Sequence, residues 1–365
     1  YFQVAMKPTP SIAKVQESIS LSKNTPTYFI ADIASNHDGD IERAKELIFL
    51  AKDAGADAVK FQHFLAEKIV SDYGFRHLGK QAGHQSAWKK SVFEVFRDAE
   101  CRREWNAVLA ATAGRANIDF LTTPYDVAAV DGIDQYVPAY KIGSGDITWT
   151  EFISYVACKD KPVLLATGAS EISDITRAVD AVLEHNKNIM LMQCNTNYTG
   201  NIENLHYVNL NVLKTYAAMY PDMLLGLSDH TPGHATALGA IALGACAVEK
   251  HFTSDNRREG PDHAFSMNPV TWRDMVDRAR ELESAMGSGI KQVEKNEQET
   301  VVLQQRCLRL TRDIKAGEMI RTEDVEALRP APLGAYKPFE KAQVLGRVLR
   351  RDMEKGQEIY PRDFI

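Results

Sequence analysis

The sequence contains no cysteine arrangement that would staple a fold or build a structural metal site. Its five cysteines are scattered along 365 residues, are odd in number, and include no CxxC pair. Disulfide scaffolds and closed zinc sites use paired or clustered cysteines. We therefore expect reduced thiols in a cytoplasmic protein, and a chain of this length buries a sizeable core without such staples.

Long apolar runs and an excess of positive charge are also missing. No apolar segment approaches the ~18 residues that cross a bilayer, so we expect no membrane span. Lysine and arginine number 43 against 49 aspartates and glutamates, which gives a formal net charge of −6. A general nucleic-acid-binding protein would show a basic face. We therefore expect neither a nucleic acid nor a membrane as partner.

The first residues lack the charged and apolar regions of a signal peptide. The opening letters YFQ resemble the remnant of a cleaved purification tag. We therefore expect the native chain to begin at Met6, and we assign residues 1–26 to a tag remnant and an N-terminal extension.

Short segments rich in β-branched and apolar residues recur after this extension. There are eight of them, at residues 28–34, 58–64, 119–125, 139–144, 162–168, 189–195, 224–230 and 245–252. Most are separated by helical periodicity, as in 41–51, where Asp40 is the expected N-cap. Strand–helix alternation predicts parallel strands, and eight units in about 260 residues fit a (β/α)8 TIM barrel. A doubly wound open sheet stays an alternative, because periodicity gives order but not closure.

The character of the chain changes after about residue 287. Residues 288–304 are polar and charged and predict a linker, whereas residues 305–365 alternate short apolar runs with glycine turns. Two phrases of this last part, DIKAGEMIRTEDV and DMEKGQEIYPRDF, indicate an internal repeat of one turn-plus-strand unit. A module of about 60 residues is marginal alone, so we expect it to pack on another surface.

Polar residues gather where the predicted strands end, which is where barrel enzymes carry their catalytic groups. Lys60 and Lys141 interrupt otherwise apolar strands. A buried lysine without a partner is costly, so both indicate an anionic ligand in the barrel mouth. Hydroxyls of Thr123, Ser144 and Ser228 could complete a phosphate or carboxylate pocket. Two alternatives are ion pairs at the barrel rim and a Schiff-base lysine, as in aldolases.

Two histidines, His230 and His251, end the neighbouring seventh and eighth predicted strands. A pair of imidazoles there could ligate one divalent cation and leave positions for water and substrate. The alternative is a pair of buried histidines with a purely structural role, which the spacing does not exclude.

Six phrases, in this order, resemble the sialic acid (nonulosonic acid) synthase family: FIADIASNHDGD, ADAVKFQ, KIGSGD, GLSDHT, EKHFT and REGPDHAFSMNP. The tail, with LRP at 328–330, resembles the antifreeze-like SAF domain, a β-clip module that closes those enzymes. The resemblance implies a TIM barrel at 27–287, a linker at 288–304 and a SAF domain at 305–365.

The resemblance also implies a reaction. Phosphoenolpyruvate and an N-acylated hexosamine such as N-acetylmannosamine would give a nine-carbon 2-keto acid and phosphate, with C–O cleavage. A divalent cation on His230 and His251, Mn²⁺ before Mg²⁺ or Co²⁺, would polarise the acceptor aldehyde. The alternative within the family is legionaminate or pseudaminate synthesis from a diacetamido-trideoxyhexose. A non-catalytic protein that binds glycan or ice through its tail is the alternative from another class.

Residue roles follow from the same resemblance. Phosphoenolpyruvate contacts are implied for Lys60, Thr123, Lys141, Ser144 and Ser228. Sugar contacts are implied for Gln62, Tyr198, Asp262 and Arg329, the last reaching the acyl group across a domain-swapped homodimer. Many bacterial members have Glu where this chain has Asp32 and Asp146. With the two lysines, these carboxylates are the catalytic candidates, for acid–base work or for orienting water.

Overall fold

The computed structural model describes residues 22, 25–78, 85 and 88–365, so the expected tag remnant and the start at Met6 lie outside the described residues. The chain divides into two compact units, Tyr1–Gly287 and Ser288–Ile365. Each unit has a hydrophobic core of its own.

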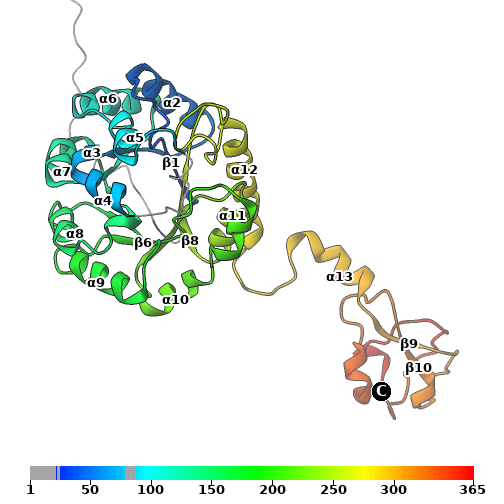
Figure 1. The fold of residues 1–365 in the computed structure, drawn as a ribbon. Coiled ribbons are helices and arrows are strands. Elements are labelled where there is room, and N and C mark those ends of the chain that lie inside the picture. The colour runs from blue at the N-terminus through cyan, green and yellow to red at the C-terminus, as the bar shows by residue number, and fades with distance from the viewer. Residues whose placement is uncertain (1–21, 23–24, 79–84, 86–87) are drawn as a thin grey trace, which may run out of the picture. The chain divides into compact units, whose positions relative to one another are not determined.

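Within its described residues, the first unit is a closed barrel of eight parallel strands that follow one another in chain order (Figure 1). The strands are β1 (Tyr28–Asp32), β2 (Ala58–His63), β3 (Asp119–Pro124), β4 (Tyr140–Ile142), β5 (Val163–Ala166), β6 (Ile189–Cys194), β7 (Leu224–Asp229) and β8 (Ala245–His251). The barrel closes where β1 pairs with β8 and Asp32 lies opposite His251. This closure confirms the TIM-barrel prediction and excludes the open sheet.

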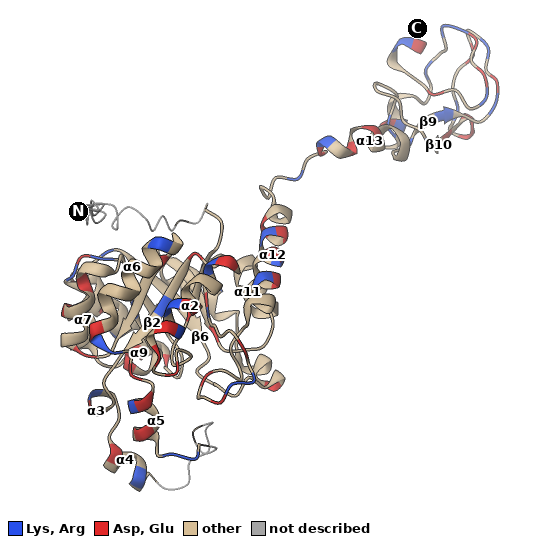
Figure 2. Cartoon of the chain, turned by 90° about the horizontal axis from the view of Figure 1, so that it is seen from above, with Lys and Arg blue, Asp and Glu red and all other residues tan. Residues whose placement is uncertain are grey.

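Helices surround the strands, as Figure 1 shows. They are α2 (Ile41–Asp53), α6 (Asn106–Ala116), α7 (Val127–Ile133), α8 (Thr150–Ala157), α9 (Ile172–Leu183), α10 (Val212–Met219), α11 (Ala235–Ala242) and α12 (Pro269–Met286). The chain makes one long excursion between β2 and α6, with the short helices α3 (Ala66–Ile69), α4 (Asp72–His77) and α5 (Val92–Asp98). Figure 2 shows that α3, α4 and α5 lie beyond one end of the barrel. No helix in the described part of the chain is long and apolar enough to cross a membrane.

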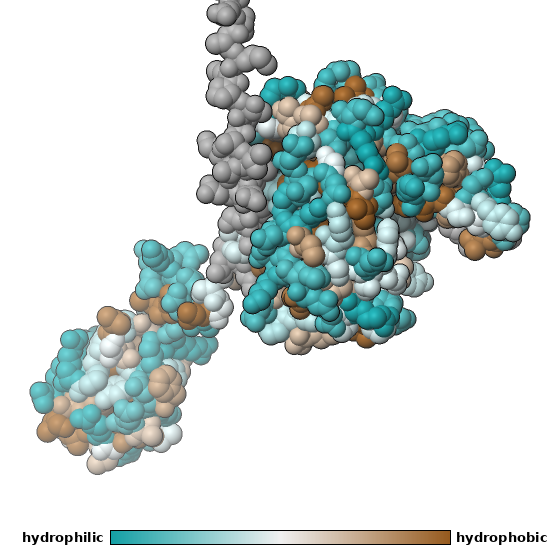
Figure 3. Space-filling view, turned by 90° about the vertical axis from the view of Figure 1, so that its left-hand side faces the viewer, coloured by the Kyte–Doolittle hydropathy of each residue, from teal (hydrophilic) through white to brown (hydrophobic). Residues whose placement is uncertain are grey.

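The helices form where the periodicity predicts them. At the start of α2, the Asp40 side chain accepts a hydrogen bond from the backbone N–H of Glu42, which confirms the N-cap. The helix then buries Ala44, Leu47, Ile48 and Ala51 against the barrel. Because apolar stripes turn inward in this way, the helix-covered face in Figure 3 is mainly hydrophilic.

Strand alternation separates two apolar layers, and this separation decides which polar residues face the barrel interior. On β2, Val59 and Phe61 belong to the layer between strands and helices, whereas Ala58 belongs to the layer inside the barrel. Because side chains alternate across a strand, Lys60 and Gln62 share the inner face with Ala58. The same alternation of side chains places polar residues of β1, β3, β4, β7 and β8 inside the barrel mouth.

The second unit contains a two-stranded antiparallel sheet of β9 (Cys307–Leu310) and β10 (Val325–Leu328). It begins with the 3-10 turn η6 (Lys295–Glu297) and helix α13 (Gln298–Gln304). This helix is joined to the rest of the unit because Ala331 N–H donates to Val302 C=O at 2.8 Å. The expected linker at 288–304 therefore contains a helix, which no apolar stripe signalled since none of its residues is buried.

The two similar phrases of this unit adopt matching turns. Gly317 and Gly356 have φ values of 85° and 84°, a left-handed conformation that glycine adopts without strain. Asp313 and Asp352 each accept a hydrogen bond from a backbone N–H in the other copy's turn, at 2.7 and 2.9 Å. The phrases then end in the 3-10 turns η7 (Thr322–Asp324) and η9 (Pro361–Asp363). The repeat thus consists of turns joined by single bridges, not of a turn and a full strand.

Candidate active site

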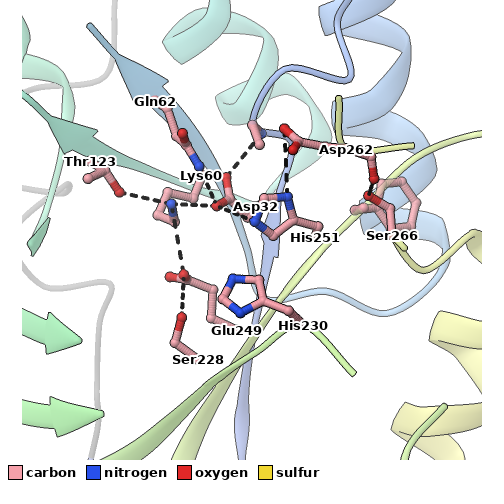
Figure 4. Close-up of polar contacts among 12 residues, drawn as sticks. Asp32, Lys60, Gln62, Thr123, Ser228, His230, Glu249, His251, Asp262 and Ser266 are labelled. Carbon is pink, nitrogen blue, oxygen red and sulfur yellow. Dashed lines mark hydrogen bonds and ion pairs between the residues drawn. The ribbon is translucent and has the colours of Figure 1, made fainter. Parts of the chain in front are cut away.

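Lys60 lies in the barrel mouth with partners on both neighbouring strands (Figure 4). Its Nζ atom is 2.8 Å from Oδ2 of Asp32 on β1 and 2.8 Å from Oγ1 of Thr123 on β3. The side chains of Lys60 and Asp32 are each only 2% exposed. The predicted strand lysine therefore faces the mouth, and an internal carboxylate neutralises it.

Lys141 has a similar arrangement on the other side of the barrel. Its Nζ atom is 2.6 Å from Oε1 of Glu249 on β8 and 3.3 Å from Oγ of Ser228 on β7. The same Glu249 oxygen lies 3.9 Å from Nζ of Lys60. A chain of alternating charges thus crosses the mouth, from Asp32 through Lys60 and Glu249 to Lys141. Ion pairing, one of the alternatives for the strand lysines, is present at both.

Glu249 is the member of this cluster that the sequence analysis missed. A signal for it existed, because Glu249 directly follows the apolar run at residues 245–248 and lies two positions before His251. A spacing of two places both side chains on the same face of a strand. The sequence could not identify the partner of Glu249, because Lys141 is 108 positions away in the chain.

Charge pairing outweighs burial in this cluster. Burial raises the pKa of Asp32, but the charges of Lys60 and His251 bring it down to about 2. Burial likewise opposes ionisation of Glu249, and the nearby charges of Lys141 and Lys60 lower the pKa of its carboxyl. The pKa of Lys60 is raised despite burial, because Asp32 and Glu249 stabilise its charge. At neutral pH the two carboxylates are ionised and balance the two lysines.

His230 and His251 lie beside this cluster, with ring centroids 5.3 Å apart (Figure 4). Nδ1 of His230 is 2.9 Å from the backbone oxygen of Asn195. A carbonyl only accepts, so Nδ1 carries the proton and Nε2 keeps its lone pair for a cation. Nδ1 of His251 is buried without a hydrogen-bond partner among the described residues. It lies 3.9 Å from Oδ2 of Asp262.

These donors fit a divalent cation of the Mn²⁺ type. No three His, Cys, Asp or Glu side chains converge into a complete metal cage in the part of the chain that the structure describes. A cation on His230 and His251 would therefore complete its shell with water or substrate oxygens, which Mn²⁺ and Mg²⁺ accept. The orphaned nitrogen of His251 is the observation that favours such a ligand.

An ion pair on the outer face of the strands holds the two histidines in place. Asp229 and Lys250 lie opposite each other in the β7–β8 register and their side chains are bonded. Asp229 also accepts a hydrogen bond from Thr236 at 2.6 Å. Because His230 and His251 are the next residues along each strand, this buried pair fixes the strand ends that present them.

The predicted sugar-binding residues of the first unit surround the same mouth. Gln62 donates from Nε2 to Oδ2 of Asp32 at 2.9 Å. The ring of Tyr198 packs on His230, with centroids 4.3 Å apart. Asp262 accepts hydrogen bonds from the backbone N–H and hydroxyl of Ser35, at 3.1 and 2.6 Å. Arg329 is an exposed residue of the second unit.

Ser144 and Asp146 follow β4 in the 3-10 turn η4 (Ser144–Asp146). The Ser144 hydroxyl accepts a hydrogen bond from the backbone N–H of Gly168 at 2.9 Å. Oδ2 of Asp146 is buried and has no hydrogen-bond partner within the described part of the chain. Burial raises the pKa of Asp146 to about 6. Asp146 is therefore the carboxyl of this set that can gain and lose a proton near neutral pH.

A cavity of about 280 Å³ opens beside these residues. Its polar lining includes Ser35, Gln62, Ser144, His251 and Asp262. Its apolar wall comes mainly from the excursion between β2 and α6, with Phe64, Ile69, Val95 and Phe96. Gln62 and His251 connect the cavity to the lysine cluster, because each lies within 3.7 Å of Asp32. The cavity suits a small ligand that carries both polar and apolar groups.

Catalytic groups at the carboxyl ends of parallel strands are typical of enzymes built on a (β/α)8 barrel, and this chain is an enzyme of that class with an added C-terminal module. A model of the NeuB family matches residues 47–291, and a model of the SAF domain matches residues 305–365. The chain belongs to the NeuB family. The family and the SAF domain expected from the motifs are thereby confirmed.

Relatives extend over most of the chain. An uncharacterized protein of Methanocaldococcus jannaschii is 36% identical and covers 94% of this chain and 96% of its own. The N,N'-diacetyllegionaminic acid synthase of Legionella pneumophila is 32% identical and covers 90% of this chain and 92% of its own. The crystal structure of the N-acetylneuraminic acid (sialic acid) synthetase of Leptospira borgpetersenii, in complex with citrate, has a TM-score of 0.66 at 28% identity. That likeness covers 76% of this chain and 91% of the other.

Proposed function

We propose that the protein is a nonulosonate synthase. It would join phosphoenolpyruvate to the open-chain aldehyde of an N-acylated hexose, forming a nine-carbon 2-keto acid and releasing phosphate. The observation that carries this proposal is the placement of two buried lysines and two available imidazoles in one barrel mouth. The names of the Legionella and Leptospira relatives support it.

Phosphoenolpyruvate would bind at the lysine cluster. Its carboxylate and phosphate need charged and hydroxyl donors, and the cluster offers Lys60, Lys141, Thr123 and Ser228, with Ser144 at the edge of the cavity. His230 and His251 would hold Mn²⁺, or Mg²⁺ or Co²⁺ in its place. Such a cation, when bound, supplies Lewis-acid polarisation of the aldehyde oxygen.

The bonds that form and break in this reaction suggest roles for Asp32 and Asp146. The electron pair of the C2=C3 bond of phosphoenolpyruvate forms the bond from carbon 3 to the aldehyde carbon, and the aldehyde oxygen takes up a proton. A water oxygen adds to carbon 2 and loses a proton. The new hydroxyl then loses its proton as the C–O bond to phosphate breaks, which releases phosphate and leaves the 2-keto group. Asp32, ionised and bonded to Lys60 and Gln62, would orient these groups without changing its charge. Asp146 would act as general base and take the proton from the attacking water.

The raised pKa of Asp146 should set the pH dependence of the reaction. Because its pKa is about 6, kcat/KM should rise with pH through about 6. Asp146→Asn should remove this limb and lower the rate by roughly 10²–10⁴-fold.

The same burial makes ionised Asp146 unfavourable: the stability contributed by its protonated form is present near pH 4 and lost as pH rises through about 6. Asp146→Asn should therefore be the more stable protein at pH 8, by at most roughly 3 kcal/mol, and no more stable at pH 4. Unchanged pH profiles and equal melting at both pH values would remove Asp146 from this role.

N-acetylmannosamine is the first acceptor to test, and a diacetamido-trideoxyhexose is the second. The apolar wall of the cavity favours the second, because Phe64, Ile69 and Phe96 offer no partner to sugar hydroxyls and would pack well on methyl groups. The experiment incubates the protein with phosphoenolpyruvate, Mn²⁺ and each sugar, and detects phosphate and the product mass. Phosphate should appear only when all components are present. If neither sugar gives phosphate and a nine-carbon product, the proposal is contradicted.

We also propose that the SAF domain works as part of a domain-swapped homodimer in the cytoplasm, with Arg329 reaching the acceptor's acyl group in the partner's barrel. Five cysteines outside any disulfide support a reducing compartment. Arg329→Ala should raise KM for the acceptor by about tenfold or more, the worth of one lost charged contact, and leave KM for phosphoenolpyruvate unchanged. Arg350→Ala, at another exposed arginine of the domain, is the matched control.

A mixing experiment separates swapping from action within one chain. At an acceptor concentration below KM, Arg329→Ala protein is expected to be about tenfold or more slower than the unaltered protein, and His230→Ala protein is expected to be nearly inactive. In a swapped dimer, the intact histidine pair of one chain meets the intact arginine of the other, so mixed dimers should regain turnover. Failure to regain it, or a monomer in sedimentation, would contradict the swapped arrangement.

A further inference from the structure

Glu249 offers an inference that rests on the proposed function and goes beyond it. We propose that Glu249 is an internal anion that occupies the lysines of the mouth, so that phosphoenolpyruvate must compete with its charge. Glu249 would then set the affinity for phosphoenolpyruvate as a positioning residue that acts through Lys141 and Lys60.

The contacts of Glu249 are one-sided. Oε1 accepts hydrogen bonds from Nζ of Lys141 at 2.6 Å and from Oγ of Ser228 at 3.1 Å. Oε2 is buried and has no hydrogen-bond partner within the described residues. Buried carboxylate oxygens normally have partners. Figure 4 shows the Glu249 side chain reaching from β8 to the position between Lys60 and Ser228, where the proposed anion would bind.

Asp32, the other carboxylate of the cluster, is held differently. Oδ1 of Asp32 accepts from the backbone N–H of Ala34 at 3.0 Å, and Oδ2 accepts from Lys60 and from Gln62. Both oxygens are therefore used, and the backbone fixes one of them. Glu249 has a longer side chain and contacts with side-chain donors alone, so it is the carboxylate whose donors an incoming anion can take over.

The charge of the mouth makes this competition strong. Lys60 and Lys141 are balanced by Asp32 and Glu249, and no lysine or arginine occurs among the described residues that line the adjoining cavity. Phosphoenolpyruvate adds a carboxylate and a phosphate to this neutral cluster. Without a cation on the histidines, its binding gains little net attraction for as long as Glu249 keeps its charge.

The test measures binding of phosphoenolpyruvate to protein freed of metal with a chelator, by isothermal titration calorimetry. Glu249→Gln keeps the shape of the side chain and an acceptor for Lys141, but removes the charge. We expect it to bind phosphoenolpyruvate roughly tenfold more tightly than the unaltered protein, and to gain less affinity when Mn²⁺ is added. KM for phosphoenolpyruvate should fall, with kcat falling as well. A residue with a merely structural role would raise KM. Equal or weaker binding by Glu249→Gln overturns the inference.

Asp229→Asn is the matched control. Asp229 is also a buried carboxylate paired with a lysine, but it lies on the outer face of the same strands. Its substitution should leave metal-free binding of phosphoenolpyruvate unchanged, and an equal tightening there would overturn the inference. If circular dichroism shows that Glu249→Gln does not fold, Glu249→Asp takes its place. It draws the charge back by one methylene, so twofold or greater tightening is expected and no tightening overturns the inference.

The same titrations separate this inference from the proposed function. Unaltered protein that binds no phosphoenolpyruvate, with or without Mn²⁺, contradicts the proposed function, and the inference falls with it. Unaltered protein that binds phosphoenolpyruvate, with no tightening in Glu249→Gln, leaves the function standing and removes the role of Glu249 alone.

Discussion

Lys60→Met is expected to abolish turnover and to lower the free energy of unfolding by about 3–5 kcal/mol. Turnover is lost because the cluster loses one of its two cations and one donor to phosphoenolpyruvate. Stability is lost because Asp32, only 2% exposed and 2.8 Å from the lysine, stays buried without its counter-charge. Activity is followed by phosphate release, and stability by urea unfolding at neutral pH.

A double variant separates the two effects. Asp32→Asn/Lys60→Met removes both charges, so most of the lost stability should return while turnover stays absent. Lys45→Met, which breaks an ion pair on the surface of α2, should change neither quantity appreciably. If Lys60→Met were as stable as the unaltered protein and active, Lys60 could be neither the buried counter-charge of Asp32 nor a substrate contact.

The second large effect is expected at the histidine pair. His230→Ala removes one of two imidazoles, so the affinity for Mn²⁺ should fall by about 100-fold or more and turnover should be lost. Mn²⁺ binding is measured directly by electron paramagnetic resonance, without substrates. Binding of phosphoenolpyruvate to metal-free protein should be unaffected, because the lysine cluster is intact.

His234→Ala is the matched control for this measurement. His234 lies four residues further along the same loop and pairs with Asp274 at 3.2 Å, away from the mouth. Its substitution should leave Mn²⁺ binding unchanged. A His230→Ala protein that turns over at the full rate after removal of metal would exclude the proposed metal role.

The eight strands, the helices between them and the polar residues of the mouth follow from patterns in the sequence, whereas closure of the barrel needed the pairing of β1 with β8. Each strand is a short apolar run, and its side chains alternate with a period of two. For this reason the sequence alone places Lys60 and Lys141 within strands, and His230 and His251 at strand ends. The SDHT and EKHF phrases belong to neighbouring strands of the closed barrel, and their histidines lie with ring centroids 5.3 Å apart.

Sequence patterns could not identify the residues that pair with the strand lysines across the barrel. A lysine in an apolar strand signals that a counter-charge exists, but not whether a ligand or a distant strand supplies it. The structure shows that Asp32 and Glu249 supply it, from β1 and β8. The apolar wall of the cavity was also missed. Phe64 and Phe96 meet with ring centroids 5.4 Å apart, although short helices without a strong period separate them in the chain.

The most direct test of the proposed condensation follows the bridging oxygen atom of phosphoenolpyruvate. Phosphoenolpyruvate labelled with ¹⁸O at the bridge between carbon 2 and phosphorus is incubated with the protein, Mn²⁺ and the acceptor sugar. Mass spectrometry then locates the label. The proposed condensation breaks the C–O bond, so the released phosphate should carry the ¹⁸O and appear in equal amount with a nine-carbon keto acid. Unlabelled phosphate, or labelled phosphate without the keto acid, would contradict the proposal.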